Sequence, residues 1–557
     1  MKYREEEMLI FQPGNIAYIN KEGESVLDSA KSAGVFCNNF CGGKGTCGKC
    51  KVKVEIGEFN EISKEEKNFL GEDEIKEGYR LACYLYPRFL FKTCEITFTD
   101  DTENEEYEIQ DKGKDIDFYQ EKLDKIFKGN HTNEGFQMEQ RYGIAVDVGT
   151  TNIEALLWRI DKCQCVGRIV KKNPQQRYGA DVVARICYAN EKEINYKELC
   201  EILQQEIVGM VRNFEEYIDG EGIEKIVIAG NAVMMHFLNE CPIDGFVKAP
   251  YVGSYKRGIE MKGDLWGIPD CNMIFFPNIE SFVGADTVGV IYASWDNFKS
   301  SNSILLIDIG TNGELVMWKD EKCYVASTAA GPAFEGSSIT FGMRAEKGAI
   351  FGISILPDKV ELQVIGGEKP KGICGSGLVE LVAKLYTMGV IDKTGYLCTR
   401  EEAKNKQLPV FLQERLISNH HGNSFVLFQE GEKLVYLSQK DIRELQLAKA
   451  AILSGVETLL EKCKVSANDI EKCYLAGAFG TYLDKECGKI IGLLPNISTE
   501  KFECIGNAAL FGASRVLFEN DGFKKTTGIA EAANHIVLGE DTSFQERYIL
   551  CMDFPSI

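Results

Sequence analysis

The chain has 557 residues, of which 44% are hydrophobic and 26% charged, with 20 cysteines and a formal net charge of −21. This length predicts three or four domains, and the acidic balance argues against a nucleic-acid role. The N-terminus lacks the apolar core of a signal peptide, and no apolar run is long enough to span a bilayer. We therefore expect a cytoplasmic protein without a membrane partner, whose cysteines are mostly reduced.

The first hundred residues alternate between strand and helix patterns. Residues 8–20 read as two short strands. A helix is expected next, with Ser25 as its N-cap and Gly34 just beyond its C-terminal end. Residues 51–56 have the period of a strand, and residues 79–99 are strand-like again.

Between that helix and the strand at 51–56 lies a cysteine-rich loop. Its last three cysteines are spaced C-x5-C-x2-C, and one more cysteine follows at a distance. Plant-type [2Fe–2S] sites have C-x4-C-x2-C and a distant fourth ligand, and the gap of five resembles vertebrate-type ferredoxin loops. Glycines in the loop let the backbone wrap and present N–H groups to sulfur. The predicted cluster ligands are Cys41, Cys47, Cys50 and Cys83, and Cys37 stays an alternative to Cys41.

Two other interpretations of these cysteines are weaker. A zinc ribbon needs two C-x2-C knuckles, and this loop has one. A disulfide scaffold belongs to exported proteins, and no export signal is recognised here. A strand pair, a helix, a cluster loop, a strand and a final ligand follow the order of a β-grasp ferredoxin. We therefore expect an α+β domain over residues 1–99.

The next segment is expected to be an acidic linker over residues 100–140. Residues 100–117 hold nine acidic side chains against two lysines, a charge run typical of a solvated linker. Residues 118–127 have the pattern of one short helix. Such a linker would let the cluster domain move.

The rest of the chain contains an internal duplication. Residues 144–150 read IAVDVGT and residues 305–311 read LLIDIGT, each followed by a second apolar strand. A further pair of similar stretches begins at Ile223 and at Ile470, in the same order. The duplication predicts two related α/β halves, about 141–303 and 304–557.

The turns of the duplicated stretches have the chemistry of phosphate loops. Glycine permits a close backbone approach, N–H groups and the Thr hydroxyl bind phosphate oxygens, and the aspartate is placed for Mg²⁺. Neither stretch is a Walker loop or a Rossmann fingerprint. Together with Leu475–Gly480, they resemble the fold shared by acetate and sugar kinases, heat-shock chaperones and actin. The resemblance implies ATP and Mg²⁺ as ligands, with Asp147, Asp308 and Asp286 as catalytic residues. It implies a nucleotide site made by Gly149, Thr150, Thr151, Gly310, Thr311, Asn312, Gly313, Gly477, Ala478 and Gly480.

A ferredoxin domain ahead of an actin-like ATPase domain resembles the reductive activators of corrinoid proteins. The stretches 173–181, 283–287, 328–336 and 372–378 also carry this resemblance. It implies that ATP drives transfer of one electron from a [2Fe–2S] cluster to the Co(II) corrinoid of a partner protein, restoring Co(I). It also implies an electron donor such as a ferredoxin or flavoprotein, and a homodimer is one expected assembly.

Several other residues have more ordinary interpretations. His236 is expected to be a core histidine rather than a metal ligand, and Cys163 and Cys165 are expected to bind nothing. Cys374 lies in a glycine turn. Glu335, like Asp286, is expected either to orient water or Mg²⁺ or to cap a helix.

Two alternative functions remain at this stage. The first is a small-molecule kinase with a fused redox-sensing ferredoxin domain, which predicts a phosphorylated metabolite. The second is a nucleotide-dependent chaperone whose cluster is structural, which predicts no reversible redox change.

Overall fold

The computed structural model describes residues 8–12, 15–21, 23–35, 37, 41–88, 93–98, 108–127, 141–179, 181–248, 251–336, 338–419, 422–431 and 433–556. The chain divides into two compact units. One comprises Met1–Phe276 and Ala513–Asn520, and the other Pro277–Gly512 and Asp521–Ile557. In the ranges just given, no helix is long and apolar enough to cross a membrane.

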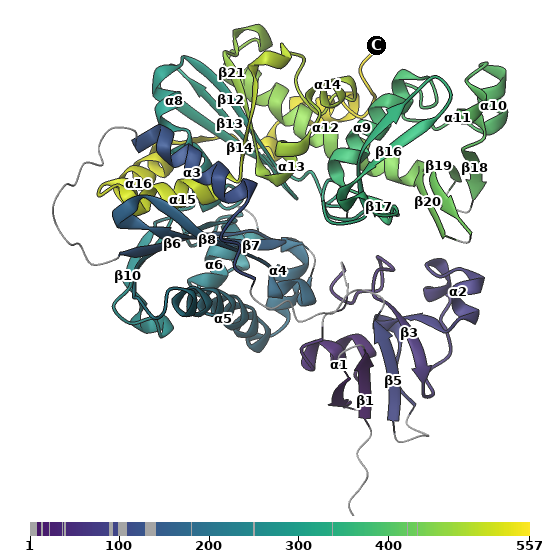
Figure 1. Ribbon diagram of the computed structural model, residues 1–557, viewed down its shortest axis with the longest axis horizontal. Helices are drawn as coiled ribbons and strands as arrows, with labels where there is room; N and C mark the ends of the chain where they lie inside the picture. The colour runs from purple at the N-terminus through teal and green to yellow at the C-terminus, as the bar shows by residue number, and fades with distance from the viewer. Residues whose placement is uncertain are drawn as a thin grey trace, which may run out of the picture. The chain divides into compact units, whose positions relative to one another are not determined.

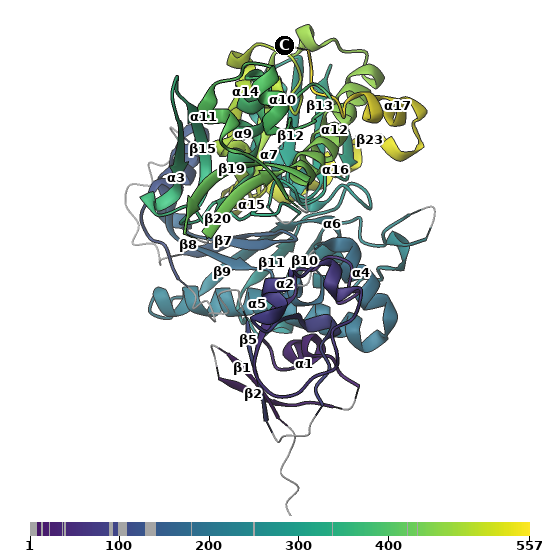
Figure 2. The same cartoon turned by 90° about the vertical axis from the view of Figure 1, so that its right-hand side faces the viewer.

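The N-terminal domain is a mixed sheet with a helix beside it (Figure 1). The strand order is β2-β1-β5-β3-β4, and β1 runs antiparallel to β2 but parallel to β5. Figure 2 shows α1 beside the edge made by β1 and β2. The element order is the one expected for a β-grasp ferredoxin. The bounds are β1 Met8–Gln12, β2 Ile16–Ile19, α1 Val26–Ser32, β3 Lys51–Ile56, η1 Glu66–Asn68, α2 Glu72–Lys76, β4 Tyr79–Leu81, η2 Ala82–Tyr84 and β5 Thr93–Phe98.

Helix α1 begins and ends where the sequence predicts. Ser25 is its N-cap and forms a capping box with Asp28, which satisfies backbone N–H groups of the first turn. Gly34 follows the C-cap with a φ of +75°, a conformation that favours glycine. Val26, Leu27 and other apolar side chains of the helix are buried in the domain core.

The expected linker is partly folded. Helix α3 spans Lys114–Phe127, so the predicted short helix begins four residues earlier. Its apolar positions Ile116, Tyr119 and Leu123 are buried. Gln120 donates to the Cys163 carbonyl and accepts the N–H of Cys165, both at 2.9 Å. The prediction of a solvated linker is therefore wrong for this helix. An amphipathic pattern at helical spacing, hidden among the acidic residues, is the physical reason.

Residues 142–276 form a sheet in the order β10-β11-β9-β6-β7-β8. β6 pairs antiparallel with β7 and parallel with β9, so the hairpin is followed by a crossover. The bounds are β6 Tyr142–Val148, β7 Asn152–Arg159, η3 Ile160–Lys162, β8 Gln164–Lys172, η4 Pro174–Tyr178, α4 Val182–Glu191, α5 Glu193–Tyr217, β9 Ile223–Gly230, α6 Ala232–Leu238, η5 Asp244–Phe246, β10 Ile259–Lys262, η6 Gly263–Trp266 and β11 Asn272–Phe275.

The following residues repeat this pattern in a sheet of order β22-β21-β12-β13-β14-β23, whose strands β12, β13 and β14 are side by side in Figure 1. Smaller sheets have the orders β16-β15-β17 and β18-β19-β20. The strands are β12 Ser303–Ile309, β13 Gly313–Lys319, β14 Lys322–Thr328, β15 Ala349–Ile355, β16 Val360–Val364, β17 Gly372–Ile373, β18 Leu416–Asn419, β19 Gly422–Glu430, β20 Lys433–Ser438, β21 Lys472–Ala476, β22 Phe502–Gly506 and β23 Asn534–His535. The helices are α7 Ala285–Ala293, α8 Trp295–Ser300, η7 Ile365–Gly367, α9 Gly375–Thr387, α10 Arg400–Asn405, α11 Val410–Gln413, α12 Gln439–Lys462, η8 Ala467–Asp469, α13 Gly477–Tyr482, α14 Lys485–Ile490, η9 Thr499–Lys501, α15 Ala508–Phe518, α16 Gly522–Ala532, η10 Leu538–Glu540 and α17 Thr542–Leu550.

The duplicated stretches therefore occupy equivalent positions. In each half, a strand ending in Asp-x-Gly-Thr forms a hairpin with the next strand and pairs in parallel with a later one. The later strands are β9 and β21, which contain the second pair of similar sequences. The predicted α/β duplication is confirmed.

A buried lysine fastens the C-terminal tail to α12. The Lys449 side chain is fully buried, and its Nζ donates to the carbonyl oxygens of Cys551 and Asp553, the latter at 2.6 Å. Burial lowers the pKa of Lys449 to about 8, below its usual value of about 10.4. At a pH between these two pKa values, the unfolded chain binds more protons than the folded one.

The contribution of Lys449 to the free energy of unfolding should therefore rise with pH over this window. We expect the difference between wild type and Lys449→Met in urea denaturation to grow by about 2 kcal/mol from pH 8 to pH 10. A difference that does not change with pH would contradict the burial of a charged lysine.

Candidate functional site

The cysteine loop lies between α1 and β3 and is shaped by glycines. Gly42, Gly43, Gly45 and Gly48 have φ values of +65°, +94°, +73° and +68°. These left-handed conformations turn the chain repeatedly within ten residues, so the cysteines converge. The hydroxyl of Tyr84 donates to the Gly45 carbonyl at 3.1 Å and joins the loop to the segment that carries Cys83.

The four predicted ligands form two pairs. The Sγ atoms of Cys41 and Cys47 are 3.4 Å apart, and those of Cys50 and Cys83 are 3.2 Å apart. The second pair is brought together by backbone pairing, because Ala82 donates its N–H to the Cys50 carbonyl at 2.7 Å. Cys37 is buried in the hydrophobic core of the domain.

Each pair contains one thiol whose pKa is lowered and one whose pKa is raised. The hydrogen bond from Cys47 lowers the pKa of Cys41 to about 4 and raises the pKa of Cys47. Hydrogen bonding in the other pair lowers the pKa of Cys50 and raises the pKa of Cys83. No three His, Cys, Asp or Glu side chains of the described residues are grouped to hold a single metal ion. Two thiol pairs suit two irons, with two thiolates each, so these residues fit a binuclear cluster.

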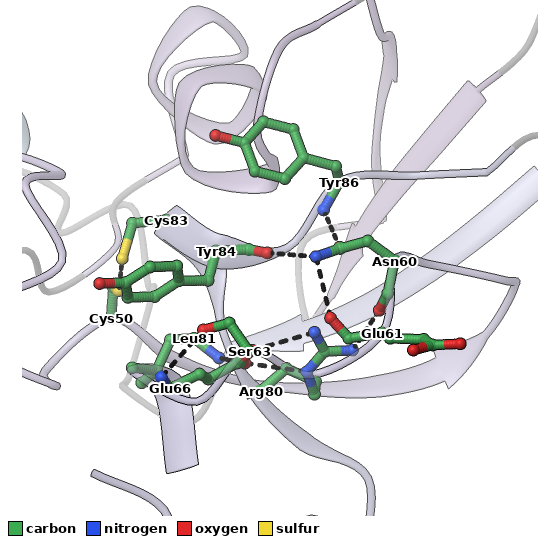
Figure 3. Close-up of polar contacts among 10 residues, drawn as sticks. All are labelled: Cys50, Asn60, Glu61, Ser63, Glu66, Arg80, Leu81, Cys83, Tyr84 and Tyr86. Atoms are coloured by element: carbon green, nitrogen blue, oxygen red, sulfur yellow. Dashed lines mark hydrogen bonds and ion pairs between the residues drawn. The ribbon is translucent and has the colours of Figure 1, made fainter. Parts of the chain in front are cut away.

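A buried ion pair supports the segment around Cys83 (Figure 3). Arg80 donates Nε and Nη2 to the two carboxylate oxygens of Glu66, at 2.8 and 3.0 Å, and the Glu66 side chain is fully buried. The same carboxylate accepts the N–H of Leu81 at 2.8 Å. A bidentate pair of this kind fixes direction as well as distance.

The amide of Asn60 completes this support on the other side of Cys83 (Figure 3). Its Nδ2 donates to the Tyr84 carbonyl at 2.9 Å, and its Oδ1 accepts the N–H of Tyr86 at 2.7 Å. Together with the Glu66–Arg80 pair, Asn60 holds the backbone on both sides of Cys83. Sequence reasoning missed these residues, because their partners lie 14 to 26 positions away.

The first phosphate-loop sequence is the turn between β6 and β7. Asp147 lies near the end of β6, and the N–H of Gly149 donates to the Asn152 carbonyl at 2.9 Å, which closes the turn. The cross-strand partner of Asp147 is Glu154. Arg168 donates to the Glu154 carboxylate at 2.6 Å.

The second phosphate-loop sequence is the turn between β12 and β13. The N–H of Gly310 donates to the Asn312 carbonyl at 3.0 Å, as in the first loop. The Thr311 hydroxyl donates to Glu335 Oε1 at 2.5 Å, so Glu335 is bound to this loop. Burial raises the pKa of Asp308 to about 6.

Further carboxylates gather at the second loop. Glu314 is the cross-strand partner of Asp308, and its pKa is raised first by burial and then by the charges of Asp286 and Asp308. The side chain of Asp286 also accepts the N–H of Thr287 at 2.7 Å, at the start of α7. Among the described residues, these carboxylates are not grouped closely enough for three of them to hold one ion directly, so a Mg²⁺ here would be bound partly through water.

Glu314 was missed in the sequence, although a signal was present. A glutamate follows each Asp-x-Gly-Thr aspartate, as Glu154 after Asp147 and as Glu314 after Asp308, and both are cross-strand partners. The predicted adenosine sequence begins beside the same aspartate. A Cβ on Gly477 would lie 2.7 Å from Asp308 Oδ1, and Gly477 has a φ of +83°.

The predicted site residues are thus distributed over the two compact units. Asp147, Gly149, Thr150 and Thr151 belong to the first unit, together with the cysteines. Asp286, the second loop from Asp308 to Gly313, and Gly477, Ala478 and Gly480 belong to the second. Their roles as catalytic, nucleotide-binding and metal-binding residues stay predictions.

The ordinary interpretation of His236 is confirmed. Its Nδ1 lies 2.8 Å from the Ala232 carbonyl and its Nε2 accepts the N–H of Tyr255 at 3.0 Å, which assigns a neutral ring protonated at Nδ1. Burial lowers the pKa of His236 further. The Cys374 thiol is buried and lies 3.3 Å from the Ile350 carbonyl, and Asp181 caps α4.

Comparison with known proteins agrees with this architecture. Family profiles match residues 11–88 as a 2Fe-2S iron-sulfur cluster binding domain, residues 142–295 as the RACo middle region and residues 302–557 as the C-terminal domain of RACo, the ASKHA domain. ASKHA is the fold shared by acetate and sugar kinases, heat-shock chaperones and actin. The predicted fold class is confirmed, and the chain has an iron–sulfur domain and an ATP-binding domain.

Three proteins are similar over most of the chain. The corrinoid activation enzyme RamQ of Eubacterium limosum is 32% identical, over 94% of this chain and 95% of its own length. The [Co(II) methylated amine-specific corrinoid protein] reductase of Methanosarcina barkeri is 23% identical, over 73% of this chain and 76% of its own. A solved reductive activator for a corrinoid, iron-sulfur protein covers 99% of this chain and 98% of its own, with 27% identity and a TM-score of 0.67. The chain therefore belongs to the family of corrinoid activation enzymes.

Proposed function

We propose that the protein is an ATP-dependent reductive activator, which transfers one electron to the Co(II) corrinoid of a partner protein and restores Co(I). The observation that carries the proposal is the arrangement of four thiols as two pairs, at 3.4 and 3.2 Å, in a chain that also has two Asp-x-Gly-Thr hairpins. A kinase needs no such redox site, and an electron carrier needs no duplicated nucleotide loops.

The cluster is a [2Fe–2S] centre bound by Cys41, Cys47, Cys50 and Cys83. When bound, it accepts and returns one electron at a time. The Glu66–Arg80 pair and Asn60 hold the Cys83 segment in place for the second thiol pair. A fixed ligand geometry favours electron transfer, because less of the protein must rearrange when the charge changes.

ATP and Mg²⁺ bind at the two hairpin loops. Asp147, Asp308 and Asp286 would provide carboxylates for the metal or its water ligands, while backbone N–H groups of the loops and the Thr150 hydroxyl would bind the phosphates. ATP promotes the transfer only if it binds one arrangement of activator and partner more tightly than another. Nucleotide binding is therefore coupled to recognition of the corrinoid protein.

The partners follow from this reaction. The acceptor is a separate corrinoid protein, and the electron donor is a ferredoxin or flavoprotein of low potential, because plant-type [2Fe–2S] centres lie near about −400 mV. We also propose that the protein is located in the cytoplasm and forms a homodimer.

The test is formation of Co(I) in a defined mixture. Reduced activator, ATP, Mg²⁺ and a cognate Co(II) corrinoid protein should develop the Co(I) absorption band, and omission of ATP should abolish it. Growth of the band at the same rate without nucleotide would show that ATP does not drive the transfer. Accumulation of a phosphorylated metabolite, without any response of the corrinoid protein, would favour the kinase alternative.

A further inference from the structure

The first hairpin loop is the turn between β6 and β7. Its backbone is bound by side chains that lie outside the predicted nucleotide motifs. The three successive carbonyl oxygens of residues 149–151 each accept a hydrogen bond from a side chain. Asn173 Nδ2 donates to the first at 2.8 Å, Arg185 Nη2 to the second at 2.5 Å, and Gln176 Nε2 to the third. The N–H of Asn173 also donates to the third carbonyl, at 2.9 Å.

Arg185 is the central residue of this set. It lies on α4 and is fully buried. Its Nε donates to the Gly179 carbonyl at 2.9 Å, and its Nη1 to Gln175 Oε1 at 3.3 Å. Gln175 is itself buried and bonded to the Leu199 carbonyl at 2.9 Å. The planar guanidinium thus has a fixed direction, which an ammonium group could not reproduce.

The bonds to the carbonyls determine where the amide groups of the loop point. In a planar trans peptide, the carbonyl of one residue and the N–H of the next point in opposite directions. Because the carbonyls of residues 149–151 are directed toward Asn173, Arg185 and Gln176, the N–H groups of residues 150–152 are directed away from them. Aligned N–H groups of this kind form a site for phosphate oxygens.

The two hairpin loops differ in the charged side chain that is bonded to them. The first loop has the buried guanidinium of Arg185 bonded to it, whereas the second has the carboxylate of Glu335 bonded to Thr311. The charges of Asp286 and Asp308 both act on the buried Glu314 carboxyl and raise its pKa. A buried positive charge attracts an anion more strongly than an exposed one, because water screens it less. The bonded guanidinium therefore suits the first loop to phosphate.

From these contacts we infer that Arg185 is a positioning residue for the nucleotide phosphates. With Asn173 and Gln176 it orients the N–H groups of residues 150–152 toward phosphate oxygens, and its charge favours the anion. This inference deepens the proposed function and rests on ATP binding at the first loop. It assigns a role to the stretch 173–181 and to α4, which otherwise carry only a family resemblance.

The experiment is calorimetric titration of the full-length protein with ADP and with adenosine. Arg185→Lys keeps the positive charge but loses the planar guanidinium with its several N–H donors. This variant should bind ADP about tenfold more weakly than wild type. Arg185→Met should bind ADP about 100-fold more weakly, because both the charge and the hydrogen bonds are lost. Adenosine has no phosphate, so its affinity should change less than about twofold in both variants.

The matched control is Arg159→Met. Arg159 belongs to the same sheet but bonds Asp161, at the end of β7 remote from the loop, so ADP binding should match wild type. If Arg185→Met does not fold, Asn173→Ala serves in its place. This variant should bind ADP about tenfold more weakly than wild type, with its affinity for adenosine unchanged.

The outcomes separate this inference from the proposed function. Unchanged ADP affinity in a folded Arg185→Met or Asn173→Ala variant overturns the inference and leaves ATP binding intact. Equal losses for ADP and adenosine also overturn it, since they indicate general damage to the fold. A wild-type protein that binds neither ATP nor ADP contradicts the proposed nucleotide site itself.

Discussion

Replacing Cys83 with alanine should remove most of the brown colour of the anaerobically purified protein. Cys83 shares its thiol pair with Cys50 at 3.2 Å, so its loss leaves one of the two irons with a single cysteine ligand. We expect wild type to contain two irons and two sulfides per chain, and the variant to retain less than about a fifth of them. Iron and sulfide analysis with visible spectroscopy measures this.

Cysteines of the same domain provide the controls. Cys37 and Cys94 are both buried in the domain core. Alanine at either position should leave the iron content and spectrum unchanged. If Cys37→Ala bleaches the protein and Cys41→Ala does not, Cys37 is the ligand and our assignment is wrong.

Loss of either loop aspartate should nearly abolish ATP turnover. Asp147→Asn and Asp308→Asn keep the size of the side chain but remove the charge for Mg²⁺, so we expect the rate of phosphate release to fall by about 100-fold or more. The visible spectrum should be unchanged, because neither residue belongs to the cysteine site. Both aspartates should act on one nucleotide, so the double variant should be little worse than the worse single one.

Asp320→Asn is the corresponding control. Asp320 lies in the exposed turn between β13 and β14, at the opposite end of β13 from the second loop. Its turnover should equal that of wild type. Independent, multiplicative losses in the Asp147/Asp308 double variant would indicate two separate sites instead of one.

Features with local causes could be predicted from the sequence. The helix cap at Ser25 depends on residues three positions apart, and the hairpins at 147–152 and 308–313 depend on a strand pattern broken by Gly-Thr. The convergence of Cys41, Cys47 and Cys50 follows from glycines within one loop. In these cases the interacting groups are near neighbours in the chain, so spacing alone carries the information.

Features that depend on distant partners could not be predicted. The start of α3 at Lys114 depends on burial of Ile116 and Leu123, which the surrounding acidic residues conceal. The pairing of Glu66 with Arg80 requires β4 to be in place. The role of Arg185 depends on the Thr150 carbonyl, 35 positions earlier in the chain. Such contacts become visible only when the fold specifies which segments meet.

The unequal chain separations of the two thiol pairs have a consequence for folding. Cys41 and Cys47 are 6 positions apart, whereas Cys50 and Cys83 are 33 apart. A cluster bound to all four would act as a covalent cross-link, and closing a loop of this length removes about 3.7 kcal/mol of chain entropy from the unfolded state. That is a large share of the stability of so small a domain. Chelation of the iron should therefore melt the N-terminal domain by itself, well below the temperature at which the rest of the chain unfolds, so iron supply would control the lifetime of this domain.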